Sequence, residues 1–156
     1  MKNRVITYIF LFILLFCLTG CKKTETTTDA SYFIDCAYKI SKGEITSAVI
    51  IDLRPLQNDI YEDDYDHGHI HGALSFNYAM QTEEKFTNWI KGLKNTNTTV
   101  YLIDSGNGEY ETISAYLEKA GYKKIIAYTL GYQELKKCGD FTTKIEESTG
   151  IEDCGC

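Results

Sequence analysis

The stretch TVYLIDSGNGEY, residues 99–110, decides the fold of this chain. Its first part, Thr99–Ile103, is apolar and β-branched, which predicts a buried strand, and a helical pattern begins near Tyr110. In a strand–loop–helix unit the backbone N–H groups of the loop converge on one point, where the helix N-terminus adds positive potential. The loop consists of Asp104, Ser105, Gly106, Asn107, Gly108 and Glu109. We therefore expect an anion-binding type of loop that, in this chain, carries carboxylates of its own.

Strand-like and helix-like segments alternate on both sides of this loop. The expected strands are Ala48–Ile51, Leu74–Phe76, Thr99–Ile103 and Lys124–Tyr128. The expected helices cover Phe33–Ile40, Phe86–Leu93, Ile113–Ala120 and Tyr132–Lys137, and Thr82 is the expected N-cap of the second. This alternation favours an α/β fold with a single small parallel β-sheet flanked by helices on both faces. Ligands of such folds bind at the carboxyl ends of the strands, where the Asp104 loop lies.

The N-terminus is typical of an export signal. Lys2 and Arg4 precede the apolar run Val5–Leu18. This run is shorter than the about 20 residues that a transmembrane helix needs. The run ends at Leu-Thr-Gly-Cys, which resembles the bacterial lipoprotein signal, in which the cysteine, here Cys21, becomes the lipidated N-terminus. We therefore expect a lipoprotein of the bacterial cell envelope, held on the extracytoplasmic side of a membrane. An ordinary secretory signal or a membrane anchor are the alternatives.

The expected division of the chain follows from this reading. It is a signal peptide at 1–20, a flexible Thr-rich tether at 21–30, one folded domain at 31–140 and a polar tail with Cys-x-Cys at 141–156.

The net charge limits the possible binding partners, and the cysteine content limits the possible disulfides. The formal net charge is −6, and it would become −8 once Lys2 and Arg4 are removed with the signal. Such a charge argues against nucleic acid as a partner and against charge-driven binding to anionic lipid, so membrane attachment would come from the acyl chains. With Cys21 acylated, the thiols available for disulfides are Cys36, Cys138, Cys154 and Cys156, and the pairing stays open.

Three ordered segments resemble the rhodanese-like domain family. Residues 49–55 (VIIDLRP) resemble its first signature, an apolar strand that ends in Asp-x-Arg, and residues 65–73 (YDHGHIHGA) resemble its second, with His71 in place of a proline. Residues 116–132 resemble its closing helix, strand and glycine turn. The resemblance covers about Ser31 to Gly139, and the segment between Arg54 and Tyr65 is longer than in the family.

The resemblance implies an α/β domain whose active loop has six residues and opens with a cysteine. In the family this thiolate is activated by the loop N–H groups and carries a persulfide sulfur, and an arginine late in the loop helps to bind the anionic substrate. Counting back without gaps from Leu117 and Gly121 places Asp104 at the cysteine position and Glu109 at the arginine position. A second alignment, which needs an insertion, places Ile103 there instead. Neither alignment leaves a cysteine in the loop.

A carboxylate cannot form a persulfide, but it can accept the loop N–H groups itself. Asp104 is therefore expected to cap the loop, and Glu109 adds a like charge that repels thiosulfate. The expected function is a non-catalytic binding or interaction module, with a protein or small-molecule partner that the sequence does not name. No cofactor is expected.

Two alternatives place chemistry elsewhere. His67, His69 and His71 alternate and could bind a transition metal if the backbone were extended, although His69 belongs to the family element and is expected to be structural. Cys154 and Cys156 could support sulfur transfer or thiol-disulfide exchange, or form a structural disulfide with another cysteine. The Asp52-x-Arg54 pair is expected to be a structural ion pair.

Overall fold

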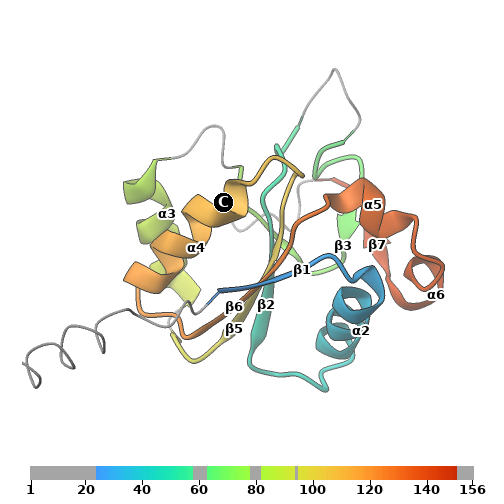
Figure 1. Cartoon of the computed structure of the whole chain (residues 1–156), viewed down its shortest axis with the longest axis horizontal. Coiled ribbons are helices and arrows are strands. Elements are labelled where there is room, and N and C mark those ends of the chain that lie inside the picture. The colour runs from blue at the N-terminus through green and yellow to red at the C-terminus, as the bar shows by residue number, and fades with distance from the viewer. Residues whose placement is uncertain (1–23, 58–62, 78–81, 94, 151–156) are drawn as a thin grey trace, which may run out of the picture.

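The computed structural model describes residues 24–57, 63–77, 82–93 and 95–150, and it shows a central sheet between two helical layers (Figure 1). The sheet has the strand order β1-β6-β5-β2-β4, and all its neighbours are parallel. Its strands are β1 (Thr24–Thr27), β2 (Ala48–Asp52), β4 (Leu74–Ser75), β5 (Thr99–Ile103) and β6 (Lys124–Tyr128). The helices are α2 (Ala30–Ser41), α3 (Glu83–Ile90), α4 (Glu109–Lys119), α5 (Tyr132–Lys136) and α6 (Phe141–Lys144), with a 3₁₀ turn, η2, at Lys91–Leu93. A small antiparallel ribbon joins β3 (His69–Ile70) to β7 (Glu147–Ser148).

The central strands are in register at both ends. The strands β2, β5 and β6 begin side by side at Ala48, Thr99 and Lys124, and they end side by side at Asp52, Ile103 and Tyr128. We call these two rims of the sheet the amino edge and the carboxyl edge. The loop that begins at Asp104 therefore leaves the middle of the carboxyl edge, as expected.

Alternation along each strand divides the core between the two layers. In β5, Tyr101 and Ile103 pack with α2, α5 and α6, whereas Val100 and Leu102 pack with α3 and α4. All four of these side chains are buried, and burial of an aliphatic side chain such as Leu102 stabilises the fold by about 1.5–3 kcal/mol. The predicted α/β class, with helices on both faces of one parallel sheet, is confirmed.

The N-caps explain where two helices begin. The side chain of Asp29 accepts a hydrogen bond from the backbone N–H of Tyr32, and that of Thr82 accepts one from Lys85. Each cap satisfies a donor that the first helical turn leaves without a partner, a contribution of about 1 kcal/mol. The predicted cap at Thr82 is confirmed.

The flexible tether predicted for 21–30 is wrong from Thr24 onward. Thr24–Thr27 forms β1, which pairs in parallel with β6 from Thr24 beside Ile125 to Thr27 beside Tyr128. Threonine is β-branched and suits an extended backbone. The outermost strand of a sheet can remain polar because solvent covers one side of it. The polarity that suggested a tether is therefore that of an edge strand.

The segment after residue 140, predicted to be a polar tail, is part of the fold as far as Gly150. Phe141 is buried and packs edge-to-face on Tyr132, and β7 pairs with β3. A single apolar residue in a short polar helix gives little periodicity, so the sequence does not reveal this packing.

Within the described residues, no helix has the length and apolar character needed to cross a bilayer. The predicted signal peptide, Cys21 and the pair Cys154 and Cys156 lie outside the described residues.

Candidate functional site

The loop after β5 is organised around the carboxylate of Asp104, which is completely buried. Its Oδ2 accepts hydrogen bonds from the backbone N–H groups of Gly106 (3.2 Å) and Gly108 (2.9 Å). Its Oδ1 accepts one from the N–H of Tyr110 at 3.0 Å, in the first turn of α4. The loop N–H groups thus converge as expected, and the group at their centre is a side chain of the loop itself.

Two glycines give the loop its curvature. Gly106 and Gly108 have φ values of +96° and +89°, a region that L side chains rarely adopt, and these two residues direct their N–H groups at the same oxygen. Gly108 is also the N-cap residue of α4 and makes no side-chain cap, so the Asp104 carboxylate serves that helix end instead.

Glu109 lies on the outer side of the same loop and is partly exposed. Both oxygens of its carboxylate lie 2.7 Å from the Ser105 hydroxyl, which donates to it, and the Asn107 amide donates to the same hydroxyl at 2.8 Å. The loop therefore fixes a second negative group next to Asp104, where the family resemblance places an arginine.

The pKa values of the Asp104 and Glu109 carboxylates are shifted in opposite directions. Burial raises the pKa of Asp104, and the neighbouring Glu109 adds to the increase, although the N–H groups of Gly108 and Tyr110 oppose it. Burial also acts to raise the pKa of Glu109, but the hydrogen bonds from Ser105 and Asp104 outweigh it and the pKa is lowered.

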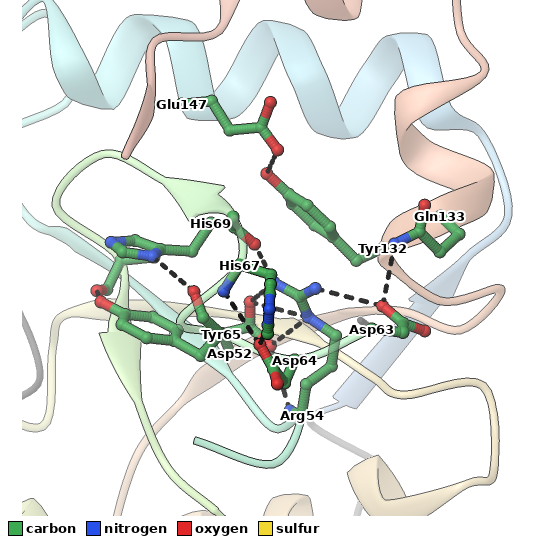
Figure 2. A network of polar contacts seen from close by, with 12 residues as sticks. Asp52, Arg54, Asp63, Asp64, Tyr65, His67, His69, Tyr132, Gln133 and Glu147 are labelled. Atoms are coloured by element: carbon green, nitrogen blue, oxygen red, sulfur yellow. Dashed lines mark hydrogen bonds and ion pairs between the residues drawn. The ribbon is translucent and has the colours of Figure 1, made fainter. Parts of the chain in front are cut away.

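A second charged cluster, centred on Arg54, lies beside the loop and is shown in Figure 2. Arg54 is buried, and its guanidinium donates to both oxygens of Asp52, with Nη2–Oδ2 at 2.7 Å. It also donates to Asp63 at 3.2 Å and to the carbonyl of Gly68 at 2.7 Å. Its charged carbon lies 3.8 Å from the centre of the Tyr132 ring. The predicted structural ion pair is confirmed, and it joins β2 to the second signature and to α5.

The C-terminal part of the chain closes this cluster. The Tyr132 hydroxyl donates to Glu147 at 3.0 Å, and Lys136 donates to the same carboxylate at 2.7 Å. Burial and the Glu147 charge raise the pKa of Tyr132, so that its hydroxyl remains a donor. The sequence does not reveal this role of Glu147, because Glu147 lies in the segment that the sequence predicts to be a polar tail.

The three alternating histidines contact three different partners. His67 Nδ1 lies 2.8 Å from Asp64, His69 Nδ1 lies 2.8 Å from the carbonyl of Tyr65, and His71 Nδ1 lies 2.8 Å from the Ser148 hydroxyl. The His69 ring is buried and stacks on the Tyr65 ring with centroids 3.7 Å apart. Among the described residues no three potential ligands gather around one point, so the geometry gives the metal alternative no support.

The described cysteines lie away from the loop. Cys36 on α2 and Cys138 after α5 are both free and partly buried, and Cys138 Sγ lies 3.4 Å from the Ser31 hydroxyl. A disulfide between these two residues, one of the open pairings, is therefore not present. Pairings that involve Cys154 or Cys156 stay predictions.

Gly131 supports the Asp104 loop from the neighbouring turn. It has a φ of +87°, and a Cβ at this position would lie 3.2 Å from the carbonyl oxygen of Ser105. The preceding residue, Leu130, is about half exposed (48%) next to Gly106. Neither contact was predicted, although the position of Gly131 in the turn after β6, which ends at Tyr128, could have suggested that it lies at the carboxyl edge.

Solved structures support the fold at low sequence identity. The solution NMR structure of the rhodanese-like domain from the Anabaena sp. Alr3790 protein is 18% identical, with a TM-score of 0.53 over 77% of this chain and 78% of that chain. The crystal structure of the Alr3790 protein gives 15% identity and a TM-score of 0.51 over 76% and 82%. The crystal structure of thiosulfate sulfurtransferase from Pseudomonas aeruginosa gives 15% and 0.51, over 81% of this chain but only 20% of that chain. Identities this low show a shared fold and nothing more.

Comparison with curated protein sequences gives no significant match. The family model of the rhodanese-like domain matches residues 35–138, which is most of the described chain. Together with the parallel sheet and the loop at its carboxyl edge, this match identifies the chain as a member of the rhodanese-like domain family.

Proposed function

We propose that this protein is a non-catalytic member of its family, a binding or interaction module that a lipid anchor at Cys21 holds in the bacterial cell envelope. The observation that carries the proposal is the seating of Asp104. Its carboxylate accepts the N–H groups of Gly106, Gly108 and Tyr110, which are the groups that would otherwise receive a thiolate or an anionic substrate.

Charge supports the same conclusion. Sulfur transfer of the family type needs a sulfur nucleophile and attraction for an anion such as thiosulfate, and a carboxylate supplies neither. Glu109, held by Ser105, keeps a negative group where a cation would assist. The loop therefore retains the backbone architecture of an anion site. The side chain of Asp104 occupies that site, and Glu109 repels an incoming anion.

The alternative enzyme would place sulfur or redox chemistry on other cysteines. Cys36 and Cys138 are free but lie on or beside helices outside the loop. The N–H groups of Gly106, Gly108 and Tyr110 are directed at Asp104 and not at either thiol. Cys154 and Cys156 are the other candidates, and the contrast between the two proposals is testable.

A thiosulfate:cyanide sulfurtransferase assay on the purified protein separates the proposals. We expect turnover no higher than the buffer background and no persulfide mass shift after incubation with thiosulfate. Turnover well above background that disappears in Cys154→Ser/Cys156→Ser would instead establish the alternative enzyme.

Restoring the nucleophile provides the matched gain-of-function test. Asp104→Cys alone should form little persulfide because Glu109 still repels the donor, whereas Asp104→Cys/Glu109→Arg should form clearly more. The control is Glu109→Arg alone, which lacks the thiol and should stay at background. Equal persulfide loading in the single cysteine variant and the double variant would show that the charge of Glu109 does not matter.

A further inference from the structure

The amino edge of the sheet, opposite the Asp104 loop, carries a group of exposed lysines. Four exposed lysines, Lys42, Lys91, Lys123 and Lys124, lie at or next to the amino edge. Lys124 is the first residue of β6, and Lys123 precedes it. Lys42 caps the C-terminus of α2 ahead of β2, and Lys91 follows Ile90, whose carbonyl accepts from the Tyr122 hydroxyl just before β6.

These lysines differ from those at the carboxyl edge in their partners. Within the described residues, none of the four forms an ion pair with a carboxylate, whereas Lys136 pairs with Glu147 and Lys137 with Glu134. Acidic residues lie near the amino edge as well: Glu25 is the exposed second residue of β1, and Glu118, in the last turn of α4, accepts a hydrogen bond from Thr24. Glu44 follows the end of α2 ahead of β2. Helix dipoles favour cations at Lys42 and Lys91, but Lys123 and Lys124 lie beyond the end of α4.

The chain reaches this edge directly from the proposed anchor. Thr24, the first residue of β1, pairs with Ile125, so β1 begins at the amino edge beside Lys124. Only Lys22 and Lys23 separate Thr24 from Cys21 in the sequence. Three residue steps span at most about 11 Å even when fully extended. A lipid on Cys21 would therefore hold the amino edge close to the bilayer, where the first strand leaves no room for a long tether.

We infer that the amino edge rests on an anionic bilayer surface and that the Asp104 loop faces away from the membrane. This inference rests on the proposed lipid anchor. The two rims lie at opposite ends of parallel strands, so an anchor at one rim exposes the other (Figure 1). Lysines that are not neutralised by a carboxylate are attracted to anionic lipid within a Debye length of about 8 Å. The net charge of −6 is a property of the whole chain and does not describe the charge at one edge of the sheet.

Lysine footprinting on the full lipidated protein tests the orientation. The protein is bound to vesicles of phosphatidylglycerol and phosphatidylethanolamine, its lysines are acetylated, and the rate at each is measured by mass spectrometry. The reference is the Cys21→Ser chain in buffer. We expect several-fold slower acetylation at Lys42, Lys91, Lys123 and Lys124, and an unchanged rate at Lys136 and Lys137. Equal rates at both rims, or protection at Lys136 and Lys137, would overturn the inference.

Flotation distinguishes a wrong orientation from a missing anchor. If the wild-type protein fails to float with the vesicles, the anchor proposal fails; if it floats without protection at the amino edge, only the orientation fails. Charge is tested with Lys123→Glu/Lys124→Glu, which should reduce protection at Lys42 and Lys91 at least twofold, while the control Lys136→Glu/Lys137→Glu should not. Equal protection on vesicles of neutral phosphatidylcholine would overturn the electrostatic part.

Discussion

Asp52 and Asp104 are both completely buried aspartates at the carboxyl edge of one sheet, but the fold satisfies them in different ways. Asp52 faces a cation, because Arg54 donates to both of its oxygens. Asp104 instead accepts hydrogen bonds from the backbone N–H groups of Gly106, Gly108 and Tyr110, and its side-chain neighbour Glu109 is a second carboxylate. The first arrangement is an internally neutral pair that ties segments together, whereas the second leaves its charge to be balanced by N–H groups alone. The difference shows that one sheet edge buries aspartates in two ways, with a cation in one place and with backbone N–H groups in the other.

The largest effect should come from breaking the neutral pair. Arg54→Met leaves the carboxylate of Asp52 buried without its cation, and removing one partner of a buried pair costs about 3–5 kcal/mol of unfolding free energy. Urea denaturation measures this loss. The control is Asp52→Asn/Arg54→Met, which removes both charges and should recover part of it. A double variant that is no more stable than the single one would show that packing of Arg54 on Tyr132, and not charge, dominates.

A smaller loss should follow from emptying the centre of the loop. Asp104→Ala leaves three backbone N–H groups without their acceptor, and we expect a cost of about 1–3 kcal/mol because water can reach part of the exposed loop. Asp104→Asn keeps one acceptor oxygen and should lose less. The unfolding free energy of each variant is measured alongside wild type. If Asp104→Ala were as stable as wild type, the carboxylate would not be the structural cap described above.

The smallest effect concerns pH and the sign of the Asp104 shift. Its folded pKa lies above the unfolded value, so its contribution to stability is fully present below the unfolded pKa and is lost as pH rises through the folded pKa. Relative to Asp104→Asn, wild type should therefore lose stability as the pH is raised from about 4 to 7. Glu109→Gln removes one cause of the increase and should flatten this slope. The check is the free energy of unfolding of wild type and of each variant, measured at each pH. A rise in the stability of wild type relative to Asp104→Asn with increasing pH would mean that the backbone N–H groups outweigh the effect of burial.

Much of this fold follows from local patterns, and the exceptions have physical reasons. The strands Ala48–Asp52, Thr99–Ile103 and Lys124–Tyr128 are apolar on both faces, so the sequence alone predicts a covered parallel sheet. Thr24–Thr27 has no apolar face, and its pairing with β6 depends on a contact far along the chain that no local pattern records. Edge strands are in general the hardest to recognise for this reason.

The candidate site also combines features that the local sequence predicts with features that depend on contacts between distant segments. The strand–loop–helix order and the gapless residue count locate Asp104, because both depend on neighbouring residues. The packing of Gly131 against Ser105 and the reach of Glu147 to Tyr132 join distant segments, so they become visible only in three dimensions.

The position of β1 also bears on the order in which the domain can assemble. The first strand of the described residues, β1, pairs with β6, which follows it about a hundred residues later. A contact between such distant segments requires closure of a long loop, which slows its formation relative to local contacts. A chain that emerges from a ribosome or a translocation channel N-terminus first therefore presents β1 long before its partner exists. The sheet can reach its full width only after β6 has emerged, so the growing chain carries β1 as an unpaired strand during most of its synthesis.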